Sequence, residues 1–181
     1  MKVAKCTNQT MSFVVEYIWV KKMNDSVNAF SNNLLRYYSS KEFTSYTQMA
    51  SDLGVSVGTL KCWMSGNRSP KLSTINTLAD RLGCYSYNLI KPDGSTENIG
   101  VSNKDIHQVF SKRLRIIFLK KHAITYTKKL SILNDTISYD SLVSYLRKQN
   151  YRMPSLRTLD CIADALNINT YELLMEDELD D

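Results

Sequence analysis

The sequence lacks long apolar runs, paired cysteines and histidine clusters, and each absence excludes a class of protein. No stretch of about 18 consecutive apolar residues occurs, so we expect no membrane-spanning helix. The four cysteines form no Cys-x-x-Cys pair, which argues against a metal site and against a disulfide framework. The two histidines stand in no recognisable nucleophile motif, and the glycines form no phosphate loop. We therefore expect neither an enzyme nor a bound cofactor.

What is present is typical of a globular protein. Hydrophobic residues make up 43% of the chain and charged residues 23%. The N-terminus does not have the layout of a signal peptide, because Glu16 interrupts its apolar run. We expect a cytoplasmic protein, in which Cys84 is a small buried hydrophobic side chain in a reducing compartment.

Charge is unevenly distributed along the chain. The net charge is +5, yet residues 176–181 contain five acids and no base. Setting those five negative charges aside leaves +10 on the remainder of the chain. A basic body favours a polyanionic partner. The acidic tail is typical of a solvated, disordered end, and the alternative is that it competes with nucleic acid for the basic face.

The sequence repeats itself once. Phe30, Ser31 and Leu34 recur 80 residues later as Phe110, Ser111 and Leu114. The offset grows to 84 further on, and the later pairs are Pro70/Pro154, Leu72/Leu156, Ile75/Leu159, Ala79/Ala163, Leu82/Leu166 and Tyr87/Tyr171. A repeat of this length indicates two copies of a small domain, not the shorter unit of a solenoid. We call the copies the first and the second repeat.

Apolar spacing predicts an ordered series of helices in the first repeat. The first helix covers residues 30–38, and a second begins at Thr44 or Ser45 and ends at Gly54. Ser56 caps a third helix with an inward-facing Trp63. A fourth follows Pro70 and ends at Gly83, and residues 86–90 form a short fifth.

This series resembles the Cro/repressor-type (XRE-like) helix-turn-helix family. The matching residues span about 60 positions: Thr44, Met49, Ala50, Leu53, Gly54, Val55, Ser56, Thr59, Leu60, Trp63, Gly66, Pro70, Leu72, Leu78, Ala79, Leu82, Gly83, Leu89 and Ile90. The resemblance implies an all-α chain with two tandem five-helix domains, at residues 29–91 and 106–175. The remaining parts are an N-terminal extension (1–28), a linker (92–105) and the acidic tail (176–181).

The second repeat departs from the family pattern on both sides of its third helix. The turn at residues 134–138 is two residues longer than its counterpart and lacks the glycine. Two further residues separate Tyr145 from Pro154. Core positions stay in register, because Leu142 and Tyr145 correspond to Leu60 and Trp63. We expect the fold to be kept, while the reading of DNA by this copy is open.

The N-terminal extension is rich in β-branched and aromatic residues at positions 13–20, which favours a short β-strand. Such a strand needs a pairing partner. It either packs on its own domain or joins two copies of the chain as a homodimer.

The resemblance implies that the third helix of the first repeat enters the major groove. Its candidate base-reading residues are Val57, Gly58, Thr59, Lys61 and Cys62. Candidate contacts to the DNA backbone are Ser45, Asn67, Arg68, Lys71, Lys128, Lys129, Arg147, Lys148 and Arg152. A basic first helix in the second repeat adds Lys112, Arg113, Arg115, Lys120 and Lys121. The alternative interpretation of both sets is a solvated polar surface.

The leading functional expectation is a sequence-specific double-stranded DNA-binding repressor of a bacterium or phage. Either the two repeats address two half-sites, or a homodimer binds DNA through the first repeat alone. The alternative is a protein-binding module on the same fold, such as an antitoxin or a phage inhibitor of a host nucleic-acid enzyme. A continuous basic surface favours DNA, and an exposed apolar or tyrosine-rich surface favours a protein partner acting through the second repeat.

Overall fold

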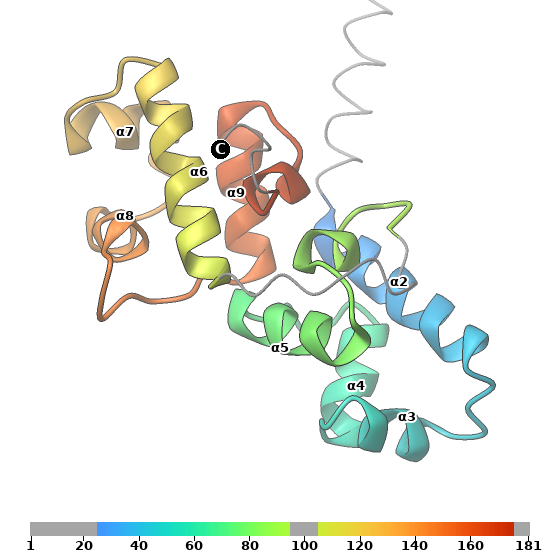
Figure 1. Cartoon of the computed structure of the whole chain (residues 1–181). Helices are drawn as coiled ribbons and strands as arrows, with labels where there is room; N and C mark the ends of the chain where they lie inside the picture. Colours follow the sequence, from blue (N-terminus) through green and yellow to red (C-terminus); the bar gives the residue numbers. More distant parts are fainter. Residues whose placement is uncertain (1–24, 95–104, 176–181) are drawn as a thin grey trace, which may run out of the picture.

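The computed structural model describes residues 25–94 and 105–175, and within these ranges it contains helices and no strand (Figure 1). The expected all-α class is confirmed for this part of the chain. The predicted N-terminal strand and the acidic tail lie outside the described residues. None of the helices described is long and apolar enough to cross a membrane.

The two repeats have the same order of helices. The first contains α2 (Ser26–Ser40), α3 (Tyr46–Asp52), α4 (Val57–Met64), α5 (Leu72–Leu82) and the 3-10 helix η1 (Ser86–Leu89). The second contains α6 (Ile106–Lys120), α7 (Tyr126–Ile132), α8 (Tyr139–Leu146), α9 (Leu156–Leu166) and the 3-10 helix η2 (Thr170–Leu173). Helix α2 begins at Ser26, inside the residues expected to form the N-terminal extension.

Helix ends follow the residues that the sequence offers as caps. The side chains of Ser45 and Ser56 accept backbone hydrogen bonds at the starts of α3 and α4, as predicted. Gly54 and Gly83 take left-handed conformations, with φ of 62° and 66°. The longer turn of the second repeat achieves its bend with Asn134 and Asp135, whose φ values are 50° and 52°. Asparagine and aspartate tolerate this conformation better than other non-glycine residues, which explains how the turn forms without glycine.

The inner faces of the helices form matching cores. In the first repeat the rings of Phe30 and Trp63 meet edge to face, with centroids 5.8 Å apart. In the second, Phe110 and Tyr145 meet in the same way at 6.0 Å. Trp63 is buried, as expected, and its carbonyl accepts a hydrogen bond from the Ser31 hydroxyl. The third helix of each repeat is thus fixed to the first by an aromatic pair.

The repeats contact each other through equivalent residues. Lys71 and Ser155, which correspond at the offset of 84, form an isolated antiparallel bridge. The amide of Leu72 donates to the Pro154 carbonyl at 2.9 Å, and the amide of Leu156 donates to the Pro70 carbonyl at 3.0 Å. Each contact is the image of the other under exchange of the repeats, which is the pattern of a two-fold symmetric dimer.

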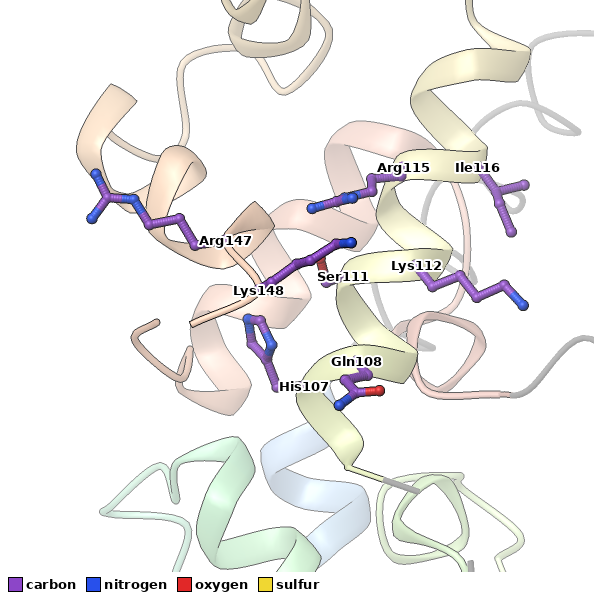
Figure 2. A pocket seen from close by; sticks show the side chains of 8 residues that line it. All are labelled: His107, Gln108, Ser111, Lys112, Arg115, Ile116, Arg147 and Lys148. Atoms are coloured by element: carbon purple, nitrogen blue, oxygen red, sulfur yellow. The ribbon is translucent and has the colours of Figure 1, made fainter. Parts of the chain in front are cut away.

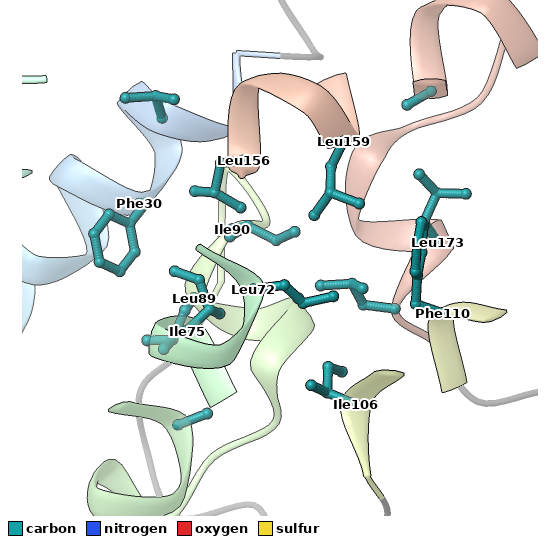
Figure 3. Close-up of a cluster of buried hydrophobic side chains, with 14 of the residues drawn as sticks. Phe30, Leu72, Ile75, Leu89, Ile90, Ile106, Phe110, Leu156, Leu159 and Leu173 are labelled. Carbon is teal, nitrogen blue, oxygen red and sulfur yellow. The ribbon is translucent and has the colours of Figure 1, made fainter. Parts of the chain in front are cut away.

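Side chains continue this relationship. Helix α2 packs against α9, and α6 packs against α5, so each first helix lies on the fourth helix of the other repeat. One cluster of buried side chains runs through both repeats (Figure 3). Its labelled members in the figure are Phe30, Leu72, Ile75, Leu89, Ile90, Ile106, Phe110, Leu156, Leu159 and Leu173. The described chain therefore has a single shared core.

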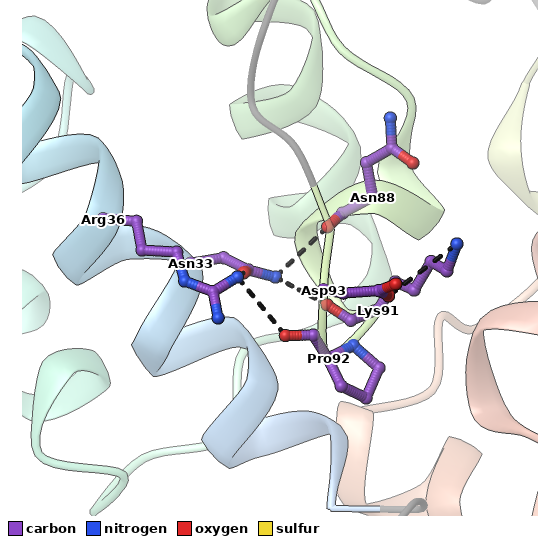
Figure 4. A network of polar contacts seen from close by, with 6 residues as sticks. All are labelled: Asn33, Arg36, Asn88, Lys91, Pro92 and Asp93. Carbon is purple, nitrogen blue, oxygen red and sulfur yellow. Dashed lines mark hydrogen bonds and ion pairs between the residues drawn. The ribbon is translucent and has the colours of Figure 1, made fainter.

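A buried asparagine holds the end of the first repeat in place (Figure 4). The side-chain amide of Asn33 donates to the carbonyls of Asn88, Leu89 and Lys91 at 3.2, 3.1 and 2.9 Å. Arg36 donates to the Pro92 carbonyl at 3.3 Å, so the first residues of the predicted linker are attached to α2. This network fixes where the chain leaves the first repeat.

Candidate nucleic-acid interface

Helix α4 has one face in the core and one in solvent. Leu60 and Trp63 are buried, whereas Gly58, Lys61 and Cys62 are exposed. Positions 58, 61 and 62 are three and four residues apart, so they share one face of the helix. Three of the five candidate base-reading residues therefore lie together on an exposed surface that contains no acidic side chain.

The other two candidates are less available. Val57 and Thr59 are half-buried. The hydroxyl of Thr59 lies 2.8 Å from that of Ser56, whose oxygen also accepts from the Thr59 amide at 3.1 Å. Thr59 thus belongs to the cap of α4 in this structure. A Cβ at Gly58, by contrast, would meet nothing within 4 Å, so this position is open to whatever approaches the helix.

Tyr46 is a surface residue of this region that is absent from the set of candidates predicted from the sequence. It is 41% exposed in the first turn of α3, and the Lys61 ammonium lies 5.7 Å from the centre of its ring. The equivalent tyrosine of the second repeat, Tyr126, also has a lysine at its ring, but this lysine comes from the same helix: the Lys129 ammonium lies 4.7 Å from the ring centre. The sequence does contain a pattern that could have indicated Tyr46, because a tyrosine recurs at the start of the second helix of each repeat. The same recurrence is equally typical of core packing. These rings orient the lysines beside them.

The candidate backbone contacts of the first repeat divide into two groups. Ser45 is exposed at the start of α3, and Asn67 and Arg68 are exposed just after α4. The amide of Arg68 donates to the Cys62 carbonyl at 3.2 Å, which holds this segment against the end of α4. Lys71 has an exposed side chain, but its main chain lies in the bridge between the repeats. The first group lies close to α4, because Tyr46 next to Ser45 contacts Lys61, and Asn67 and Arg68 follow the end of that helix.

In the second repeat the candidate cations are placed differently. Arg147, Lys148 and Arg152 are exposed after α8, and Lys128 is exposed on α7. Lys129 is engaged by two aromatic rings, those of Tyr126 and Phe118. Arg147 and Lys148 line a cleft of about 430 Å³ together with residues of α6, so the structure joins two of the predicted residues to the basic first helix (Figure 2).

The exposed surface of the second repeat is more apolar than that of the first. Ile124 is 81% exposed, Leu119 69% and Tyr139 54%. They lie just before α7, near the end of α6 and at the start of α8. The equivalent residues of the first repeat are Thr44, Ser39 and Val57. Asp140 is also exposed beside Tyr139, where a phosphate would meet an unfavourable charge.

The chain matches no protein-family model, no curated protein and no solved structure among those compared with it. Among the described residues, no three histidine, cysteine or acidic side chains gather to hold a metal ion. The functional argument therefore depends on the geometry and charge of the chain's own surface.

Proposed function

We propose that the protein is a sequence-specific double-stranded DNA-binding regulator, a repressor built from two tandem helix-turn-helix domains of the Cro/repressor type. The observation that carries the proposal is the exposed face of α4, which has Gly58, Lys61 and Cys62 at its centre and no acid. A helix with this exposure is what the major groove admits. Arg68 and Asn67 after α4 and the start of α3 supply contacts to the backbone on either side.

The relation between the repeats supports a binding mode in which one chain does the work of a dimer. Reciprocal contacts such as those of Leu72 and Leu156 bury surfaces that two separate copies would use to associate. One chain then presents α4 and α8 together. Because the two third helices have different residues, we expect an asymmetric operator, not a palindrome.

Selection of bound duplexes from a random pool tests the proposal. The full chain should enrich one motif at moderate salt. Gly58→Glu adds a carboxylate where a Cβ meets nothing within 4 Å, so the fold should be unaffected while enrichment disappears through repulsion from DNA. Gly58→Gln is the neutral control of nearly the same size and should still bind. Absence of any enriched motif with the unmodified chain would refute the proposal.

A second candidate function rests on the exposed apolar side chains of the second repeat. Ile124, Leu119 and Tyr139 occupy places where the first repeat has less apolar or smaller residues, which suits a protein partner, such as a toxin or a host nucleic-acid enzyme. Hydroxyl-radical footprinting on the selected duplex separates the two roles. Protection of two half-sites assigns the second repeat to DNA, and protection of one leaves this surface for a protein.

A further inference from the structure

A basic cleft opens on the second repeat between α6 and the segment that follows α8 (Figure 2). Its volume is about 430 Å³, which is in the range of small-molecule sites. Lys112 and Arg115 line it from α6, and Arg147 and Lys148 from the segment after α8. No aspartate or glutamate is among the lining residues. Figure 2 shows Arg115 and Lys148 extending toward each other from these two elements, while Lys112 and Arg147 point outward on either side.

Local contacts fix the walls of this cleft. Arg115 donates a hydrogen bond to the Leu146 carbonyl at the last residue of α8, which ties α6 to the chain carrying Arg147. The nearest acid in the sequence, Asp105, is occupied at both oxygens. It accepts from the His107 amide at 2.9 Å and from the Tyr151 hydroxyl at 2.8 Å. Both oxygens of this carboxylate are therefore already engaged, one of them as the cap of α6.

A buried histidine supplies an independent sign of a ligand. His107 is 1% exposed, lines the cleft and has no hydrogen-bond partner for Nε2. Its ring is stacked on Tyr151 and hydrogen-bonded to the Tyr145 backbone, so it cannot turn to find another partner without breaking these interactions. A buried polar atom without a partner is costly, and a phosphate group would satisfy it by donating from P–OH or by accepting from the protonated ring.

Comparison with the first repeat shows that the cations are particular to the second. The residues equivalent to Lys112, Arg115, Arg147 and Lys148 are Asn32, Leu35, Ser65 and Gly66, and Val27 stands for His107. In the first repeat a Cβ at Gly66 would come within 3.4 Å of Asn28, so α2 and the end of α4 approach closely there. In the second repeat these cations occur together with the two extra residues that follow α8. Packing of the core alone does not require such a group of positive charges.

We propose that this cleft is a phosphate-binding site, distinct from the DNA-reading face assigned to α4. Guanidinium and ammonium groups from α6 and from the segment after α8 would hold the phosphate oxygens, and His107 would complete the set. The phosphate is carried either by a soluble organic phosphate or by the backbone of duplex DNA. The experiment below distinguishes these two sources.

Isothermal titration of the full chain with inorganic pyrophosphate at constant ionic strength tests the site. The cleft variant is Arg147→Ser with Lys148→Gly, which introduces the residues of the first repeat at exposed positions. The control variant is Lys41→Ala with Arg81→Ala, which removes the same charge from exposed residues outside both the lining and the candidate DNA contacts. Affinity for pyrophosphate should fall about tenfold or more in the cleft variant, because two cations that donate charge-assisted hydrogen bonds are removed, and should not change in the control.

A site-specific measurement accompanies the titration. The imidazole resonances of His107 should shift on addition of pyrophosphate to the unmodified chain, and the shift should be absent in the cleft variant. Equal weakening in both variants would show that only overall charge matters and would overturn the proposal. The proposal would also be overturned if neither pyrophosphate nor a DNA duplex shifted the His107 resonances, and if the cleft variant bound both ligands as well as the control variant does.

Repeating the experiment with a random-sequence duplex identifies the source of the phosphate. Loss of duplex affinity in the cleft variant but not in the control, with no response to pyrophosphate, assigns the site to the DNA backbone. Loss of pyrophosphate binding with unchanged duplex affinity assigns it to a soluble phosphate. The pyrophosphate titration contains no DNA, and Gly58→Glu should leave it unchanged, so failure of the DNA-reading proposal and failure of this one can be told apart.

Discussion

Thr170 donates a hydrogen bond of 2.6 Å to Asp160, at the place where Ser86 donates one of 3.1 Å to Asn76 in the first repeat. The two repeats thus build the same link between the fourth and fifth helices, one with an amide and one with a carboxylic acid. Burial, with a smaller contribution from nearby Asp25, raises the pKa of Asp160 to about 6, although hydrogen bonds from Thr170 and Ser26 oppose the shift. The folded chain accordingly favours the neutral acid.

This leads to a pH-dependent prediction for Asp160→Asn. Because the pKa is raised from the ordinary value of 3.8 to about 6, the protonated acid stabilises the fold at low pH, and this stabilisation is lost as the pH rises through 6. The variant keeps an oxygen for Thr170 and has no charge to bury. We expect its free energy of unfolding at pH 7.5 to exceed that of the unmodified chain by about 1–3 kcal/mol.

Urea unfolding at pH 5 and pH 7.5 measures this difference. The advantage of the variant should be larger at pH 7.5 than at pH 5. Asp135→Asn, at an exposed position, is the control for exchanging a carboxylate for an amide. An Asp160→Asn chain that is no more stable than the unmodified protein at pH 7.5 would contradict the assignment.

Asn33→Ala should destabilise the first repeat strongly. The substitution removes the donor shared by three carbonyls, and these lie in a part of the chain that water does not reach easily. We expect a decrease of about 2–4 kcal/mol in the free energy of unfolding, because buried acceptors without partners retain their desolvation cost. Thermal and urea unfolding followed by circular dichroism give the value. The neighbouring Asn32→Ala, at an exposed position, should change stability little; equal effects of the two would contradict the role of Asn33.

The shared core predicts that the described repeats unfold as one unit. Leu159→Ala in the second repeat should lower stability by about 2–5 kcal/mol, because it leaves a cavity in the cluster that joins both repeats. In a Trp19→Phe background, Trp63 reports on the first repeat alone. Its fluorescence transition should move by the same amount as the transition seen by circular dichroism. A Trp63 transition that stays in place would show that the repeats unfold separately.

Local features of this fold can be predicted from the sequence, whereas contacts between the repeats cannot. Serine caps, glycines with positive φ and the inward-facing Trp63 each follow from residue type and helical spacing within a few positions. The bridge of Lys71 and Ser155 uses main-chain groups that every residue has, so no side-chain pattern marks it. The basic cleft is not evident as a site either, although its lysines and arginines stand out in the sequence. Whether the lysines and arginines of α6 lie near those after α8 depends on the path of the longer segment after α8, which residue spacing does not determine.

Lys61→Ala tests the base-reading role that we assign to α4. If Lys61 donates to a base edge, its removal should weaken binding to the selected duplex by about 1–3 kcal/mol and relax specificity at one position. Binding to a scrambled duplex should change much less. Fluorescence anisotropy with both duplexes measures the two affinities, and Lys41→Ala serves as the control for removal of one exposed charge. Equal weakening on both duplexes would reassign Lys61 to the DNA backbone.

Arg68→Ala should weaken binding to every duplex alike. Arg68 is exposed after the end of α4, beyond the helix face that we assign to the bases, so we expect its guanidinium to contact a phosphate. Without this cation, binding neutralises one phosphate fewer and releases fewer counterions, so we expect the slope of log affinity against log salt to become shallower by about 0.9. Titrations of the selected and scrambled duplexes between low and moderate salt give this slope. Lys41→Ala, at the exposed end of α2, should leave it unchanged. A change in specificity without a change in slope would instead place Arg68 at a base.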